Sequence, residues 1–320
     1  MLAAAVFAGL AVTGRPLPAP QWVVSQIEQR VNAALGGRVR LSIGGIRAIV
    51  DDSFVPRVRL TDVTLYSPSG ARLALLPDVR AVFGPAALLT GRLEPRVVRV
   101  AGVSVALRRL PDGRLDIPPA AGGGDLPAAL TPSDMLAAVE KAFETPGLAA
   151  LARIEVTGLA IRLDDERAGQ SVEIADGSMT FEQTGRALHF ALGFNLAAPG
   201  AAPGRAELDF TTFKGSPEAR LDARLTGIRA RTLAAQSPGF AWLGVFDAPI
   251  SGTFRSGVTA EGRVDRLAAT LDIGRGALRP DASAEPLAFE RARLAMDYDP
   301  VTGALALDGL EIDSTTLKVS

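Results

Sequence analysis

The sequence predicts a mainly β protein with a few amphipathic helices, in which a long antiparallel sheet curls into an elongated apolar groove. Two patterns lead to this fold class. Apolar and polar residues alternate along many short segments bounded by Gly, Pro or Asp, and apolar residues recur at helical spacing in only three places. With 320 residues, of which 48% are hydrophobic and 5% aromatic, the chain can bury a sizeable apolar surface.

The clearest single element is an extended β-hairpin at 92–119. Its apolar residues change phase at Gly102, and a Pro-Asp-Gly turn at 111–113 ends the long arm, because Pro favours the first central position of a turn and Gly accepts a positive φ. The apolar residues are Val98, Val100, Val103, Val105 and Leu107. The arginines expected on the solvent side are Arg96, Arg99, Arg108 and Arg109.

The first 120 residues divide into two parts. Residues 1–16 contain an apolar run that is too short to span a membrane alone, so we expect it to be part of an N-terminal membrane anchor that begins further upstream. Residues 17–120 form a helix and a curved-sheet region. The helix is predicted at 22–35, where Val23, Ile27 and Val31 recur at helical spacing before two glycines.

Residues 121–150 are predicted to be a Gly/Pro linker followed by an amphipathic helix. Three consecutive glycines stand at 122–124 beside prolines, which is typical of a flexible linker. Thr131, Pro132 and Asp134 provide a helix start, and Met135 and Phe143 then lie on one helical face.

Residues 151–320 are predicted to be a serial-strand region with one continuously apolar face. A short helical interruption is expected at 230–236, followed by an apolar patch at 240–246. The strand pattern is still running at 317–320, so we expect the region to continue beyond the given sequence. Because few helices are available to cover such a face, the sheet must fold over on itself, close into a barrel or leave an apolar trough for a ligand.

Composition argues against several classes of function. The net charge of −1 provides no field that would favour nucleic acid. The absence of cysteine removes thiol chemistry and Cys-ligated metals, and the single histidine, His189, is expected on the solvated side of a strand. The acids at 51–52 and 164–166 are expected to be solvated rather than catalytic or metal-binding. We therefore expect no enzyme, metal site or cofactor.

Several motifs resemble the AsmA-like proteins, and among them the YhdP-type branch. They are Arg92-Leu93-Glu94-Pro95 leading into the strand at 97–107, the turn at 112–116, the segment 261–267 and the turn at 297–300. The order of apolar run, helix, strand pair and serial strands is similar as well, so the resemblance covers nearly the whole chain. The motifs consist of turn residues and strand alternation, without a catalytic signature.

The resemblance implies a bridge-like lipid transfer protein, held in the bacterial inner membrane by a single N-terminal anchor, with most of the chain in the periplasm. It would carry the acyl chains of phospholipids between the inner and outer membranes, serving lipid transport or membrane homeostasis. The alternative from the same pattern is a structural or assembly-assisting envelope protein with a closed β-sandwich core or a polypeptide-binding groove. The residues predicted to line a lipid groove are Val103, Val105, Leu107, Leu188, Phe190, Leu192, Phe194, Leu208, Phe210, Leu221, Leu225, Leu271 and Ile273.

Overall fold

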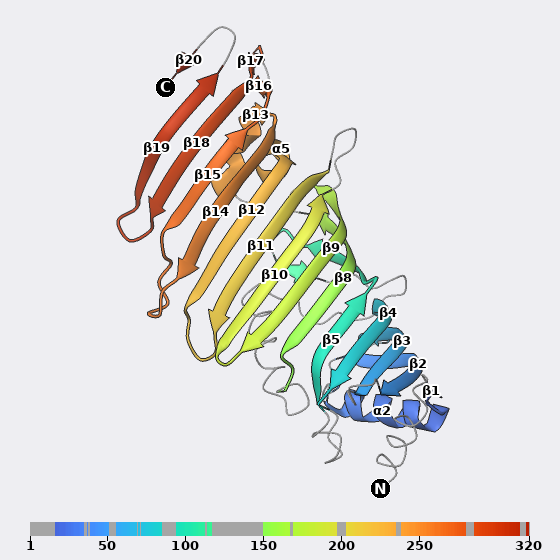
Figure 1. Cartoon of the computed structure of the whole chain (residues 1–320). Helices are drawn as coiled ribbons and strands as arrows, with labels where there is room; N and C mark the ends of the chain where they lie inside the picture. The colour runs from blue at the N-terminus through green and yellow to red at the C-terminus, as the bar shows by residue number, and fades with distance from the viewer. Residues whose placement is uncertain are drawn as a thin grey trace. The chain divides into compact units, whose positions relative to one another are not determined.

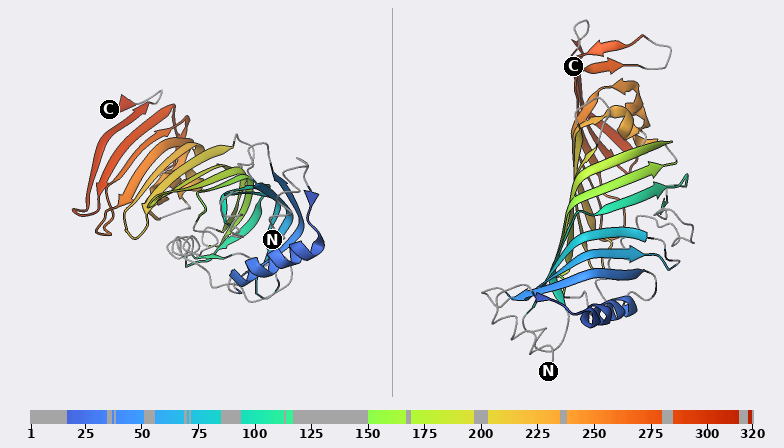
Figure 2. Two further views of the ribbon diagram at one scale, coloured as in Figure 1. Left: turned by 60° about the horizontal axis from the view of Figure 1, so that its bottom comes forward. Right: turned by 90° about the vertical axis from the view of Figure 1, so that its right-hand side faces the viewer.

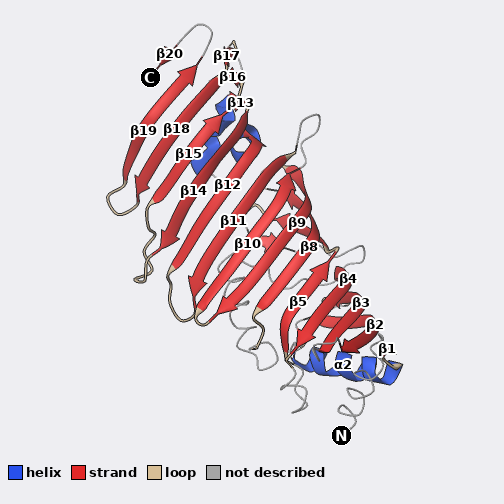
Figure 3. Cartoon of the chain, in the orientation of Figure 1, coloured by secondary structure: helices blue, strands red, loops and turns tan. Residues whose placement is uncertain are grey.

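The computed structural model has a mainly β chain that divides into two compact units, Met1–Thr184 and Gly185–Ser320. Strands dominate both units, and helices are few (Figure 3). The structure describes residues 17–34, 37, 39–50, 56–68, 70, 72–84, 94–112, 114–116, 150–166, 169–196, 203–234, 238–279, 285–313 and 318–319. The predicted anchor at 1–16 and the predicted helix around Met135 lie outside these residues.

In the residues that the structure describes, the first unit contains helix α2 and a sheet (Figure 1). Its elements are β1 (Leu17–Pro18), α2 (Gln21–Ala34), β2 (Arg40–Val50), β3 (Pro56–Tyr66), β4 (Arg72–Phe83), β5 (Pro95–Ala101), β6 (Ser104–Arg109), β7 (Leu115–Asp116), β8 (Arg153–Asp165) and β9 (Gln170–Thr184). Pairing runs from β1 through β2, β3 and β4 to β5, then through β8 to β9. The helix predicted at 22–35 is therefore confirmed, with slightly earlier bounds.

The sheet of this unit is mixed, so the prediction of an antiparallel sheet is correct for most of its ladders but not for all of them. Both β5 and β6 pair in parallel with β8. Parallel neighbours need a crossover of a dozen or more residues, and the chain between Arg109 and Arg153 is long enough to provide one. Alternation alone does not distinguish the two directions. The predicted hairpin is confirmed, because β6 pairs antiparallel with β7 and the Leu110 amide donates to the Arg114 carbonyl across the turn.

A line of backbone irregularities crosses every long strand of the first unit, and we call this line the crease. Residues with positive φ mark it on four strands or strand junctions, at Asp62, Gly102, Gly158 and Asp176. On β2 and β4 the ladders skip Gly44 and Pro77 at the same level. Bulged strands bend and twist more strongly than regular ones.

In the sequence, the apolar residues beyond the crease are shifted by one position. The irregular backbone at the crease offsets this shift, so the apolar residues stay on the same face. The same-face apolar residues on either side of it are three apart instead of two. The pairs are Ile43 and Ile46, Leu60 and Val63, Leu76 and Val79, Val100 and Val103, and Val156 and Leu159. A one-residue slip in a regular strand would move them to the opposite face. The phase change predicted at Gly102 is thus one member of a row.

Helix α2 covers part of the apolar face of this unit, and Figure 2 shows it lying against the strands. Val24, almost fully buried, packs with Ile43, Ile46, Val63 and Val79 in one core cluster. Two side chains of the helix also fix β2: Asn32 exchanges hydrogen bonds with the backbone of Leu41, and Glu28 accepts one from the Ile43 amide. In the described part of the chain, no helix is long and apolar enough to span a membrane.

The second unit is an antiparallel sheet with a small apolar layer on one face. The sheet strands are β10 (Ala187–Leu196), β11 (Gly204–Phe213), β12 (Ala219–Arg229), β14 (Pro249–Val258), β15 (Leu267–Ile273), β18 (Arg291–Asp299), β19 (Ala304–Asp313) and β20 (Lys318–Val319), which pair in this order. The other elements are α5 (Ala230–Ala234), η1 (Pro238–Val245), β13 (Phe246–Asp247), β16 (Gly276–Leu278) and β17 (Leu287–Phe289), and we call them the cap. The helical interruption predicted at 230–236 is confirmed by α5.

We expect Gly158→Ala to destabilise the protein by about 1–2 kcal/mol, because Gly158 has φ of +62° and a side chain in the left-handed region costs about that much. Urea unfolding of the full chain checks this. A matched control is Gly309→Ala, because Gly309 has no such φ and a Cβ there would meet open space, so its effect should stay within about 0.5 kcal/mol. Equal effects of the two changes would show that the crease imposes no backbone constraint.

Candidate functional site

The pairing register places all ten predicted residues of the second unit on one face of its sheet. Leu188, Phe190, Leu192 and Phe194 alternate along β10, and their partners on β11 continue the same face. The ladders carry it on through β12, β14 and β15. The ten residues are Leu188, Phe190, Leu192, Phe194, Leu208, Phe210, Leu221, Leu225, Leu271 and Ile273. We call this face the apolar face of the second unit.

The opposite face of this sheet carries charge. Arg255 on β14 pairs with Asp222 on β12 at 3.1 Å, and Arg205 pairs with Glu207 along β11 at 2.9 Å. His189 also lies there and is half exposed, with its Nδ1 3.1 Å from the Thr211 hydroxyl. The expectation that His189 lies on the solvated side of its strand is therefore confirmed.

Asp272 also lies on the polar face, and neighbouring arginines change its pKa. Arg291, and less strongly Arg293, hold the pKa of this carboxyl below its usual range, although partial burial opposes them. Because the folded-state pKa is lowered, the carboxylate stabilises the fold above the ordinary aspartate pKa of about 3.9. That contribution is lost as the pH falls through the lowered value.

The cap closes one part of the apolar face of the second unit. Leu233 from α5, Leu243 from η1 and Phe289 from β17 form a buried cluster with Leu271 and Ile273 of the sheet. Phe194, Leu208 and Leu225 pack against the same cluster. Half of the ten predicted residues therefore contribute to a closed core beneath the cap. The sandwich-core alternative predicts such a core for the whole face.

A second part of the same face lies outside this cluster. Phe190, Phe210 and Leu221 form one cross-strand row, which we call the open strip. The row is four residues, or about 13 Å, along the strands from the capped row of Phe194 and Leu225. The two phenylalanine rings are 6.1 Å apart, and Leu221 is 36% exposed. Among the described residues of this part of the face, Leu221 is exposed, Phe190 and Phe210 are half-buried, and Leu188 at the end of β10 is fully buried.

Several residues of this face are not among the predicted groove residues. Phe254 on β14 and Met296 on β18 lie in the same row as Leu192 and Leu208. Leu307 on β19 also belongs to this row and is 60% exposed. Glycine, serine and threonine interrupt the pattern around Phe254. Extending the pairing register strand by strand would have found all three.

The three predicted residues of the first unit, Val103, Val105 and Leu107, follow one another at alternate positions beyond the crease. Val105 and Leu107 continue in register to Ile161 and Leu163 on β8, and from there to β9. Val103 is buried, whereas Val105 and Leu107 are half-buried.

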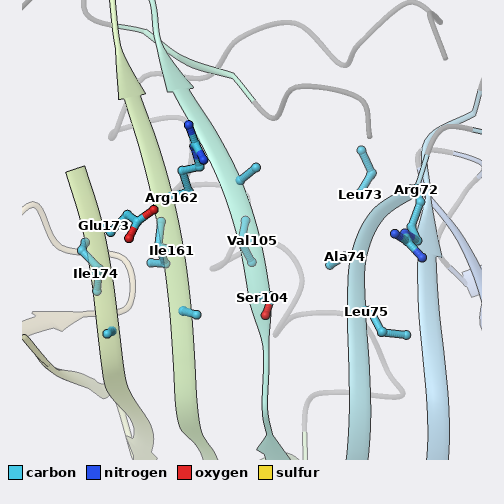
Figure 4. Close-up of a pocket in the computed structure, with 13 residues that line it drawn as sticks. Arg72, Leu73, Ala74, Leu75, Ser104, Val105, Ile161, Arg162, Glu173 and Ile174 are labelled. Atoms are coloured by element: carbon cyan, nitrogen blue, oxygen red, sulfur yellow. The ribbon is translucent and has the colours of Figure 1, made fainter. Parts of the chain in front are cut away.

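A pocket of about 590 Å³ opens beside Val105 (Figure 4). It exists because β4 and β6 share one residue pair, Leu75 and Ser104, and separate beyond it. Leu73 and Ala74 line the pocket from β4, and Val105, Ile161 and Ile174 form a cross-strand row on the other side. Most of the lining is apolar, which is typical of sites for small organic ligands.

Two predictions about charged side chains at the end of β8 are wrong. The sequence predicts Arg109 on the solvent side and solvated acids at 164–166, and the structure contradicts this for Arg109 and Asp165, whereas Asp164 and Glu166 are exposed. The register instead places Arg109 opposite Asp165, in phase with Leu107 and Leu163 on the apolar face. The side chain of Asp165 is 1% exposed, and Arg109 lies 3.4 Å away. A buried carboxylate requires such a partner. Asp164 points to the opposite face, as alternation requires, and is 42% exposed.

In the parts of the chain that the structure describes, no cluster of three or more His, Asp or Glu side chains is arranged to hold a metal ion. Asp164 has a lowered pKa because it accepts a hydrogen bond from Ser171, with Arg162 adding to the effect. Its partners are those of an ordinary surface carboxylate. The candidate functional site is therefore formed by the two apolar faces.

Comparison with known proteins found no family model, no curated protein and no solved structure that matches this chain.

Leu271→Ala and Leu221→Ala should differ in their effect on stability, although both leucines lie on the same face. Leu271 is 1% exposed beneath the cap, so its truncation should cost about 2–5 kcal/mol. Truncating the exposed Leu221 should cost less than about 1 kcal/mol. Chemical denaturation of both variants measures the difference. A large loss for Leu221→Ala would mean that the open strip is packed in solution.

Proposed function

We propose that the apolar faces of this protein bind the acyl chains of phospholipids, and that it serves lipid transport or membrane homeostasis in the bacterial envelope. The observation that carries the proposal is the open strip. Phe190, Phe210 and Leu221 form an apolar row outside the capped cluster, with Leu221 exposed, opposite a polar face that carries charge and ion pairs. An acyl chain in water costs about 0.8 kcal/mol per exposed methylene, and an apolar strip removes that cost without a directional contact.

The resemblance to AsmA-like proteins supports the same proposal and supplies its cellular setting. In this setting the N-terminus anchors the protein in the inner membrane, the two units lie in the periplasm, and acyl chains move along the apolar face of each unit. Aliphatic and aromatic contacts suit such movement because they are nearly equal from one row to the next. No residue acts as a catalyst, and no cofactor is needed.

The cap assigns different roles to the two parts of the apolar face of the second unit. The cluster around Leu243, Leu271 and Phe289 provides stability. The open strip remains for the ligand. A closed sandwich core, the alternative from the sequence, describes the capped part of the face. A polypeptide-binding groove would use the open strip as well, and the test below separates it from lipid binding.

Leu221→Asp should weaken the binding of a fluorescent phospholipid by about tenfold or more, because burying a carboxylate against an acyl chain costs at least 1–2 kcal/mol. Equilibrium titration of the full chain measures this. Thr226→Asp is the matched control, since Thr226 is exposed on the polar face of the same strand and the charge change is equal. Its affinity should be that of the wild type.

Two outcomes would contradict the proposal. One is a wild-type chain that binds no phospholipid. The other is equal weakening by both aspartates, which would point to a general effect of charge. Binding of an extended apolar peptide that Leu221→Asp abolishes, without any lipid binding, would favour the polypeptide groove.

A further inference from the structure

We infer that the pocket between β4 and β6 is a binding site for one anionic amphiphile. The acidic head group would lie at Arg72, and the acyl chain would pass between the two strands to Val105 and Ile161. This inference rests on the proposed function and extends it by naming a site in the first unit, a head-group charge and the residue that contacts it.

The pocket connects the two faces of the sheet. Arg72 is in register with Tyr66, and Leu75 with Ser104, so these residues belong to the polar face. Val105, Ile161 and Ile174 belong to the apolar face. Except for Tyr66, all of them line the same pocket, because the strands separate there and leave a slit in the sheet (Figure 4). An amphiphile needs such a site, since its two ends require opposite surroundings.

Small side chains keep the slit open on the polar face. Ser104, Ala106 and Ala160 line it there, and Ala106 stands opposite Arg162 in the ladder. A pocket of about 590 Å³ falls within the usual range for small-molecule sites, about 300–1,000 Å³. The apolar lining would hold a chain, and the charged residues at its edge would orient the head group.

The charges at the pocket favour an anion at Arg72 rather than at Arg162. Arg162 already pairs with Asp164 at 3.4 Å and stands opposite Glu173 in the ladder. Among the described residues, Arg72 forms no ion pair, and its side chain is exposed. A carboxylate or a phosphate would supply the missing partner, because a guanidinium forms charge-assisted hydrogen bonds with both.

The test is a binding titration of the full chain with three probes: a fluorescent long-chain fatty acid, its uncharged methyl ester, and a fluorescent phosphatidylglycerol. Arg72→Ala should weaken binding of an acidic probe about threefold to fivefold and leave the ester unchanged, as expected for a partly exposed ion pair. Arg224→Ala is the matched control, because Arg224 is also exposed on a polar face and forms no ion pair among the described residues. It should have no effect.

A second variant tests the slit without changing its charge. Ala106→Trp places a large side chain in the pocket and should weaken both the acid and the ester, while Arg72→Ala weakens only the acid. Since Ala106 is exposed, the tryptophan should not disturb the core. A fatty-acid effect without a phosphatidylglycerol effect identifies a free carboxylate as the head group, and the reverse identifies a phospholipid. Either result supports the site.

The inference fails if Arg72→Ala and Ala106→Trp both bind every probe like the wild type. If Leu221→Asp still weakens phospholipid binding in that case, the proposed function stands and only the site at Arg72 is wrong. If the wild-type chain binds none of the three probes, both the proposed function and this site are wrong.

Discussion

The pairing register of the strands is the constraint on which the rest of the structure depends. Side chains alternate between the two faces of a strand, so a sheet has one apolar face only if every ladder keeps the same phase. Phe190, Phe210 and Leu221 meet in one row because two ladders are in phase. A shift of one residue in either would place a leucine or a phenylalanine among the arginines.

Irregular positions maintain this phase. In the second unit, a bulge at Gly227 brings Ile228 back to the face of Leu225, and the Gly227 amide donates to the Ser251 hydroxyl at 3.0 Å. In the first unit, the crease does the same on all the long strands at one level. Positive φ costs little at Gly102 and Gly158 and is tolerated by aspartate at Asp62 and Asp176. The apolar faces therefore depend on a few polar or small residues.

Much of this fold could be predicted because alternation is a local property. The strands around Phe190 and Leu221, the helix at 22–35 and the turn after Leu110 each follow from residues that are neighbours in the sequence. The parallel pairing of β6 with β8 could not be predicted, because it depends on which distant strands meet. The buried pair of Arg109 and Asp165 was missed for the same reason, since the two residues are adjacent only through that pairing.

The candidate site was predictable as a set of residues but not as a surface. Leu221 and Leu271 both lie between polar residues in an alternating segment, yet Leu221 is exposed and Leu271 lies under the cap. The difference comes from the cap. Its elements lie in the chain between β12 and β14 and between β15 and β18, and their sequence pattern does not show where they pack on the sheet. Similarly, the pocket beside Val105 results from the separation of β4 and β6, which leaves no signal in either strand.

Site-specific photo-crosslinking in bacterial cells tests most directly whether the apolar faces carry lipid. A photoreactive phenylalanine analogue would replace Phe210 on the apolar face, and in a second variant Asp209 on the polar face of the same strand. The account predicts phospholipid adducts at position 210 and none at 209, identified by mass spectrometry. Adducts with polypeptide alone at position 210, or lipid adducts equally at both positions, would contradict it.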